Sequence, residues 1–162
     1  MENLEIVLVD FPKYNLDKFV FEELNIFIDQ VKSSHFFNNK TMKDVSFENI
    51  SSFENILMPY GSGNIVLKQL DFGIHFQDVM VLFSFDKTLG DITLNFPETS
   101  LREASIKRML CYFLKLKEKY SIPTVKFGFE PAIDADTCIV ELNDGEYELN
   151  QLVIKIEESL NK

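Results

Sequence analysis

Three carboxylates in one short connection are the residues of this chain whose type and spacing could do chemistry. Glu130, Asp134 and Asp136 lie between two β-rich runs, Thr124–Phe129 and Thr137–Leu142, and no basic residue lies among them. Carboxylates held together on a loop that a sheet anchors repel one another, so such a loop usually serves something that uses its charge. The two candidates are a divalent metal ion and a basic partner.

The spacing of these carboxylates does not match a calcium-binding loop of the EF-hand type. Counted from Asp134, that loop needs an oxygen ligand at its fifth position and glycine at its sixth, where this chain has Cys138 and Ile139. An irregular metal site that combines Glu130 with the two aspartates remains an alternative. We predict no metal ion and no cofactor.

Nucleophilic catalysis has little support in the sequence. Only His35 and His75 could act as a base of the usual kind, no Gly-x-Ser-x-Gly motif is present, and neither Cys111 nor Cys138 has a neighbouring histidine. Both cysteines lie among apolar residues, which predicts reduced, structural thiols. We predict that the protein is not an enzyme. The alternative is a small-molecule or divalent-metal-binding enzyme that uses the carboxylates of residues 130–136, with His75 as a further pocket residue.

Composition limits the class of partner. The net charge is −10 with a pI near 4.6, which argues against binding to nucleic acid or to an anionic membrane, because both need Lys and Arg. No apolar run approaches the ~20 residues of a membrane helix, and the N-terminus carries no export signal. These features predict a cytoplasmic protein whose acidic surface suits a basic protein partner.

The order of elements predicts a single α+β domain over residues 1–162, with an antiparallel or mixed β-sheet packed against about three helices. The predicted strands are Leu4–Phe11, Ile65–Leu70, Ile74–Phe76, Val79–Phe85, Ile92–Phe96, Thr124–Phe129 and Thr137–Leu142. The predicted helices are Asn15–Lys32, Ser100–Tyr120 and a closing helix marked by Leu149, Leu152, Val153, Ile156 and Leu160. Val79–Phe85 and Ile92–Phe96 should form a hairpin.

Periodic apolar residues and capping residues define the first two helices. Asn15 is the expected N-cap of the first, whose buried stripe should comprise Leu16, Phe19, Val20, Leu24, Phe27, Ile28 and Val31. Ser100 and Glu103 read as a capping box for the second. Its inward residues should be Ile106, Met109, Leu110, Phe113, Leu116 and Tyr120.

The stretch between residues 33 and 64 is the hardest to interpret. It holds a near-repeat, Ser46–Ile50 and Ser52–Ile56, whose apolar residues are three apart. This spacing predicts a short helical or 3₁₀ segment, and chance duplication explains the repeat equally well. The run from Pro59 to Asn64 predicts a break in regular structure.

The run Lys126–Thr137, together with the strand Asp91–Pro97 and the helix after it, resembles bacterial immunity proteins. These are small cytoplasmic antitoxins encoded beside polymorphic toxins of the LXG type. The resemblance implies a non-catalytic protein that binds the C-terminal domain of a cognate toxin encoded nearby and blocks it. It carries over no binding residue, because immunity surfaces diverge with their toxins.

We therefore place the partner surface, as a hypothesis, on Phe129, Glu130, Asp134 and Asp136. Pro131 restricts the backbone of this loop, so that less entropy is lost on docking. The carboxylates would meet Lys or Arg of the toxin. A merely solvated turn explains the same residues equally well. Phe129 would be an aromatic anchor if it points outward, whereas the alternation along the strand favours a core position equally.

Overall fold

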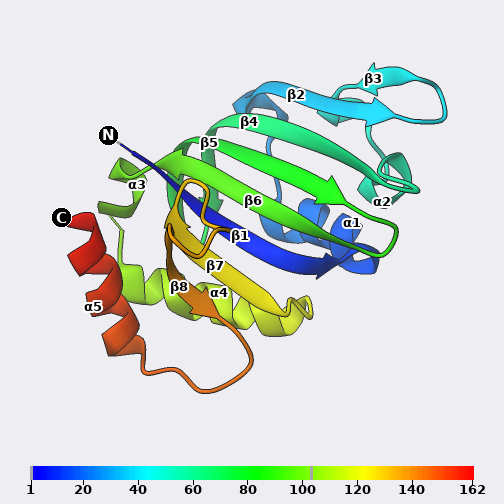
Figure 1. The fold of residues 1–162 in the computed structure, drawn as a ribbon. Coiled ribbons are helices and arrows are strands. Elements are labelled where there is room, and N and C mark those ends of the chain that lie inside the picture. Colours follow the sequence, from blue (N-terminus) through cyan, green and yellow to red (C-terminus); the bar gives the residue numbers. More distant parts are fainter. Residues whose placement is uncertain (1, 103) are drawn as a thin grey trace.

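The computed structural model describes residues 2–102 and 104–162, and its centre is one eight-stranded sheet (Figure 1). The strand order is β3-β2-β4-β5-β6-β1-β7-β8, and every registered pair is antiparallel. The predicted α+β class is confirmed in this form, as an antiparallel rather than a mixed sheet. No helix in the described part of the chain is long and apolar enough to cross a membrane.

The strands are β1 (Asn3–Pro12), β2 (Val31–Asn38), β3 (Lys43–Val45), β4 (Gly61–Phe72), β5 (Ile74–Phe85), β6 (Leu89–Pro97), β7 (Thr124–Phe129) and β8 (Cys138–Leu142). The α-helices are α1 (Leu16–Lys18), α2 (Phe53–Ile56), α3 (Thr99–Arg102), α4 (Ile106–Lys119) and α5 (Leu149–Leu160). Short 3₁₀ turns occupy Lys13–Asn15, Ile28–Gln30 and Phe47–Asn49, and a π-helical turn occupies Phe19–Leu24.

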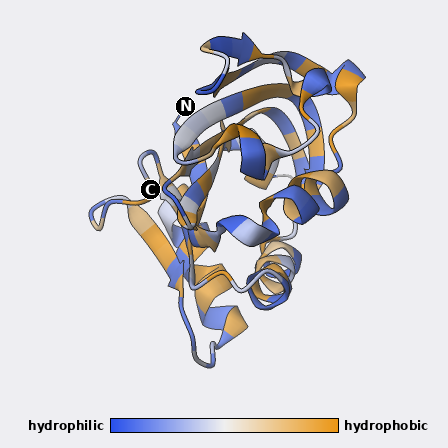
Figure 2. Ribbon diagram, turned by 90° about the vertical axis from the view of Figure 1, so that its right-hand side faces the viewer, coloured by the Kyte–Doolittle hydropathy of each residue, from blue (hydrophilic) through white to orange (hydrophobic). Residues whose placement is uncertain are grey.

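The sheet has a covered face and an uncovered face. Figure 1 shows α1 and α4 behind the sheet and the β7–β8 connection in front of it, and in the side view of Figure 2 helices gather on one side of the sheet. Phe53 of α2 packs on the same face, against Phe83 of β5. Strand β5 alternates accordingly, since Val81 and Phe83 are buried whereas Met80 and Ser84 are exposed. Along a strand successive side chains point to opposite faces, so the phenylalanines of the core lie on the covered face.

The predicted helix Asn15–Lys32 is wrong beyond Leu24. The helical turns end at Asn25, which has a left-handed backbone with φ of 44°, and the chain continues into β2. Leu16, Phe19, Val20 and Leu24 are buried as predicted, whereas Phe27 and Ile28 are exposed. Asn15 occupies the predicted N-cap position of α1, but its side chain forms no capping hydrogen bond, and its Nδ2 donates to the Tyr120 carbonyl.

Residues 33–64 contain two strands that the sequence did not predict, β2 and β3. The predicted short helical segments are confirmed, because each copy of the near-repeat forms one, Phe47–Asn49 and α2. Ser52 caps α2 by accepting from the Asn55 amide. The break predicted from Pro59 to Asn64 is wrong at its end, since β4 already begins at Gly61.

The predicted helix Ser100–Tyr120 is two helices. α3 ends at Arg102, and α4 begins at Ile106 with Ser105 as its cap. Ser100 Oγ accepts from the Gln77 amide, while Glu103, its predicted capping partner, lies outside the described residues. The inward residues are confirmed as buried: Ile106, Met109, Leu110, Phe113, Leu116 and Tyr120.

The second half of the sheet follows the sequence prediction closely. The two predicted strands Ile74–Phe76 and Val79–Phe85 are one continuous strand, β5, which forms the expected hairpin with β6. β7 has the predicted bounds, β8 begins one residue later than predicted, and α5 is the closing helix.

Candidate functional site

The connection from Glu130 to Thr137, hereafter the acidic loop, lies against the uncovered face of the sheet (Figure 1). Glu5 of β1 holds it there. This buried carboxylate accepts from the Ala132 amide (3.0 Å) through Oε2 and from Asn95 Nδ2 (3.1 Å) through Oε1. Lys126 of β7 adds a second tie, because its Nζ donates to the Ile133 carbonyl at 3.0 Å.

Backbone hydrogen bonds close the acidic loop on itself. The Pro131 carbonyl accepts from the Asp134 amide (3.1 Å), and the Asp134 carbonyl accepts from the Cys138 amide (3.0 Å). Gly128 of β7 lies directly under the loop's end, where a Cβ atom would be 2.3 Å from the Thr137 carbonyl oxygen. A larger residue does not fit there, so Gly128 allows the close approach. The loop is therefore a braced structure.

The three carboxylates that the sequence singled out are exposed at the surface of this loop. Within residues 2–102 and 104–162, the side chains of Glu130, Asp134 and Asp136 form no hydrogen bond and no ion pair. The nearby base Lys126 is engaged by the Ile133 carbonyl and by Glu141, at 3.8 Å. Within residues 2–102 and 104–162, Lys126 thus places one positive charge beside the loop, but no base forms an ion pair with these three carboxylates.

Phe129 differs from the carboxylates. It is half-buried and packs against the core, on the same face of β7 as the buried Val125 and Phe127. This placement matches the core alternative considered from the sequence. Ile133, which the sequence did not single out, is 40% exposed and is the large apolar side chain that the loop offers to solvent.

His75 does not join the acidic loop. Its Nδ1 lies 2.6 Å from Asp71 Oδ1 near the β4–β5 turn, where both side chains are exposed. Strands β6 and β1 separate β5 from β7, a distance of about 14 Å at the usual strand spacing. In the part of the chain that the structure describes, no three His, Cys, Asp or Glu residues form a group that could hold a metal ion.

Both cysteines are free and half-buried. Burial raises the pKa of the Cys138 thiol, and its Sγ lies 3.4 Å from the Val140 carbonyl oxygen. A thiol with a raised pKa is a poor nucleophile at neutral pH, because little thiolate is present. Cys138 on β8 is one strand further from His75 than β7 is, so the two residues form no catalytic pair.

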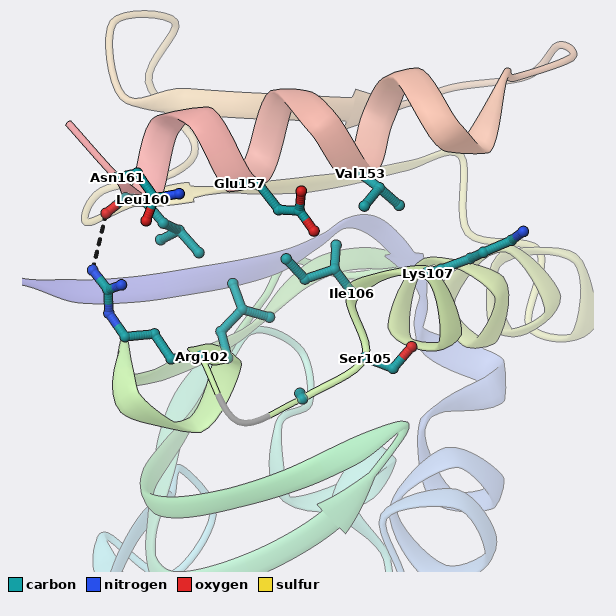
Figure 3. Close-up of a pocket in the computed structure, with 10 residues that line it drawn as sticks. Arg102, Ser105, Ile106, Lys107, Val153, Glu157, Leu160 and Asn161 are labelled. Atoms are coloured by element: carbon teal, nitrogen blue, oxygen red, sulfur yellow. Dashed lines mark hydrogen bonds between the residues drawn. The ribbon is translucent and has the colours of Figure 1, made fainter.

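A separate cleft of about 390 Å³ lies between α5 and the junction of α3 with α4 (Figure 3). Ile106, Val153 and Leu160 give it apolar walls, and Arg102 Nη2 donates to the Leu160 carbonyl at 2.9 Å across one end. None of the residues predicted as functional lines this cleft. Ser105, whose hydroxyl caps α4, lines the cleft with Lys107 and Glu157, and among the described residues no hydrogen bond joins it to either of them.

The sheet face that the helices leave open thus carries a braced and charged loop. The fold matches a chain of the 1.75 Å crystal structure of the toxic C-terminal tip of CdiA from Pseudomonas aeruginosa in complex with immune protein. The TM-score is 0.68 at 14% identity, over 91% of this chain and 98% of that chain. This similarity shows a shared fold. No curated protein sequence matches the chain.

The family is shown by sequence. The protein-family model described as PABL017 Cdi1I immunity protein matches residues 2–145, and the chain belongs to this family. It is thus a non-catalytic antitoxin that binds and neutralises a cognate toxin. The predicted immunity function and toxin partner are confirmed, and the LXG type of that toxin stays a prediction.

Proposed function

We propose that the cognate toxin docks on the uncovered face of the sheet and contacts the acidic loop with a basic surface. The observation that carries this proposal is the state of Glu130, Asp134 and Asp136. They are exposed and have no partner among the described side chains, yet their loop is fixed by Glu5 and Lys126.

Two physical effects favour binding through such a loop. Unpaired carboxylates on a protein of net charge −10 attract a basic domain from a distance, which speeds association and makes it depend on salt. The bracing by Glu5 means that little backbone entropy is lost when the toxin binds. Phe129 supports the loop from the core side, and Ile133 supplies apolar contact.

We further propose that the toxin is the C-terminal domain of a polymorphic toxin encoded beside this chain, and that the antitoxin acts in the cytoplasm. A CdiA-type toxin is suggested by the structural relative, whereas the sequence resemblance suggested the LXG type. The neighbouring gene distinguishes these two types. Residues 1–162 are proposed to form one domain, because a single apolar core joins β1 to α5.

The proposal is tested by replacing the three carboxylates together, as Glu130→Gln, Asp134→Asn and Asp136→Asn. At low salt, association with a catalytically inactive form of the neighbouring toxin domain should slow about tenfold or more, and its salt dependence should flatten. The melting temperature should change little. Surface plasmon resonance over a series of salt concentrations measures these effects.

The matched control is the triple variant Glu22→Gln, Asp29→Asn and Glu118→Gln. It changes the net charge by the same amount through three carboxylates that are also exposed but belong to the helical turns and to α4. If both variants slow association equally, the toxin senses only overall charge. If the loop variant binds like the wild type, the toxin docks elsewhere.

A further inference from the structure

A groove lies at the other end of the uncovered face, where β2, β4 and β5 run side by side. It consists of two adjoining depressions of about 360 Å³ each, which share Phe37, Ser62 and Ser84. Ser62 lies directly opposite Ser84 in the β4–β5 register. Because two short side chains face each other there, the sheet surface is low at this point and forms the floor of the groove.

Aromatic side chains stand on the rim of this groove. Phe37 of β2 is 40% exposed, and Tyr60, just before β4, is 66% exposed. Leu82 adds a half-buried apolar side chain on β5. Exposed aromatic residues around a depression are the usual composition of a binding hot spot.

Polar contacts fix the rim. Lys13, which is 4% exposed, donates through Nζ to the carbonyls of Pro59 (3.3 Å) and Asp86 (3.0 Å). Pro59 directly precedes Tyr60, and Asp86 lines the groove. Asn39 Nδ2 donates to the Tyr60 carbonyl at 2.9 Å. The groove is thus formed before any partner arrives, which reduces the entropy lost on binding.

The groove also carries negative charge. Asp44 lies opposite Phe37 in the β2–β3 register, and Asp86 lines the far end of the groove. Neither carboxylate has an ion-pair partner in the described part of the chain. A complementary segment would present an apolar side chain with Lys or Arg beside it.

The groove and the acidic loop belong to one continuous surface. Glu5 pairs with Asn95, and Asn95 pairs with Met80, so the loop's anchor lies two strands from β5. Ser84 is four residues further along β5, which places it about 16 Å from Glu5 at the usual spacings of a sheet. An ordinary interface buries roughly 800 Å² on each partner, which is wide enough to include both places.

We propose that the toxin inserts an aliphatic or aromatic side chain, flanked by Lys or Arg, into the groove between Phe37 and Tyr60. This inference rests on the proposed docking of the toxin on the uncovered face. The acidic loop would then govern how fast the toxin arrives, and the groove would govern how long it stays. Charge at an interface acts mainly on association, whereas buried anchors act on dissociation.

The test measures association and dissociation rates of the inactive toxin domain with Phe37→Ser and with Tyr60→Ser. Each variant should raise the dissociation rate at least tenfold, with an association rate within about twofold of wild type. The matched control is Phe27→Ser, which removes an aromatic ring that is 66% exposed and lies outside both the groove and the loop. Its rates should equal those of the wild type. Circular dichroism melting checks that all three variants are folded.

The outcomes separate this inference from the proposed function. If the loop variant slows association while Phe37→Ser and Tyr60→Ser leave dissociation unchanged, the toxin docks at the loop, and the proposed insertion of a side chain into the groove is wrong. If neither the loop nor the groove variants alter the rates, docking on the uncovered face is wrong. If Phe27→Ser accelerates dissociation as much as Phe37→Ser does, the effect is not specific to the groove and the inference fails.

Discussion

The covered and uncovered faces of the sheet use the same strands in opposite ways. On the covered face, aromatic rings pack edge to face, as where Phe19 meets Phe72 and Tyr120 with ring centroids 5.7 and 5.4 Å apart. On the uncovered face, short polar residues alternate with a few exposed apolar ones, and single polar contacts such as Glu5 to Ala132 hold the loop. In the docking that we propose, alternate residues of each strand therefore serve stability and recognition.

The strongest test of this division is Phe113→Ala, on the covered face. Phe113 is 2% exposed and packs against Phe72 with ring centroids 5.6 Å apart. Its loss should lower the free energy of unfolding by ~3–5 kcal/mol, measured by urea denaturation. At a temperature where the variant remains folded, its toxin association rate should match the wild type. The exposed Phe27→Ala is the control and should cost less than about 0.5 kcal/mol.

A change at Glu5 should affect both properties, because this residue connects the sheet to the acidic loop. Glu5→Ala leaves the Ala132 amide and the Asn95 side chain without their acceptor, which should cost about 1–3 kcal/mol. The loop should loosen, and toxin association should slow. Denaturation and binding rates are measured on the same sample.

The control for Glu5 is Glu141→Ala on β8, whose exposed contact with Lys126 should contribute less than about 1 kcal/mol. A Glu5→Ala variant that unfolds and binds like the wild type would show that the loop keeps its place without this carboxylate. Glu5 would then not link the stability of the sheet to the position of the loop, and the two faces would be more independent than we propose.

The smallest expected effect concerns Glu54 of α2. Burial raises the pKa of this carboxyl, and the neighbouring Asp17 raises it further. A carboxyl with a raised pKa destabilises the folded protein when it is ionised. Its penalty is therefore absent below pH 4.5 and appears as the pH rises through the folded-state pKa. Glu54→Gln removes this penalty, so at pH 7 the variant should be slightly more stable, by less than about 1 kcal/mol.

Thermal melting of wild type and Glu54→Gln between pH 4 and pH 8 measures this effect. The difference in melting temperature should be largest at the upper end of the range and should shrink toward the lower end. A difference that grows as the pH falls would mean that ionised Glu54 stabilises the contact between α1 and α2. At each pH, Glu54→Gln and the wild type should bind the toxin equally well, since Glu54 lies on the covered side.

The second half of the fold, from β5 to α5, was largely predictable because the sequence patterns that define its elements are local. The apolar period of α4 and the alternation in β7 each lie within one element. The first half was not predictable in the same way. Phe27 and Ile28 continue the apolar period of the preceding helix although the chain has already turned at Asn25. Val31–Asn38 forms a strand through its neighbours β4 and β3, while its own run of polar residues resembles a loop.

For the candidate site too, the features set by neighbouring residues were predictable, whereas those set by distant parts of the chain were not. Glu130, Asp134 and Asp136 could be singled out because an uncompensated cluster is visible in the sequence. Their position on the sheet face could not, since it depends on Glu5, which is 127 residues from Ala132. The groove beside Phe37 combines residues from β2, β3, β4 and β5, and only the strand register brings them together.

The bracing of the acidic loop has an evolutionary consequence. The residues that fix its path, Gly128 and the fully buried Ala132, are distinct from those that display its chemistry, Glu130, Asp134 and Asp136. Mutations at the displayed positions leave the scaffold intact. If the toxin docks on this loop as we propose, a lineage can change the toxin it recognises by substitutions at a few surface positions, without unfolding the scaffold that carries them.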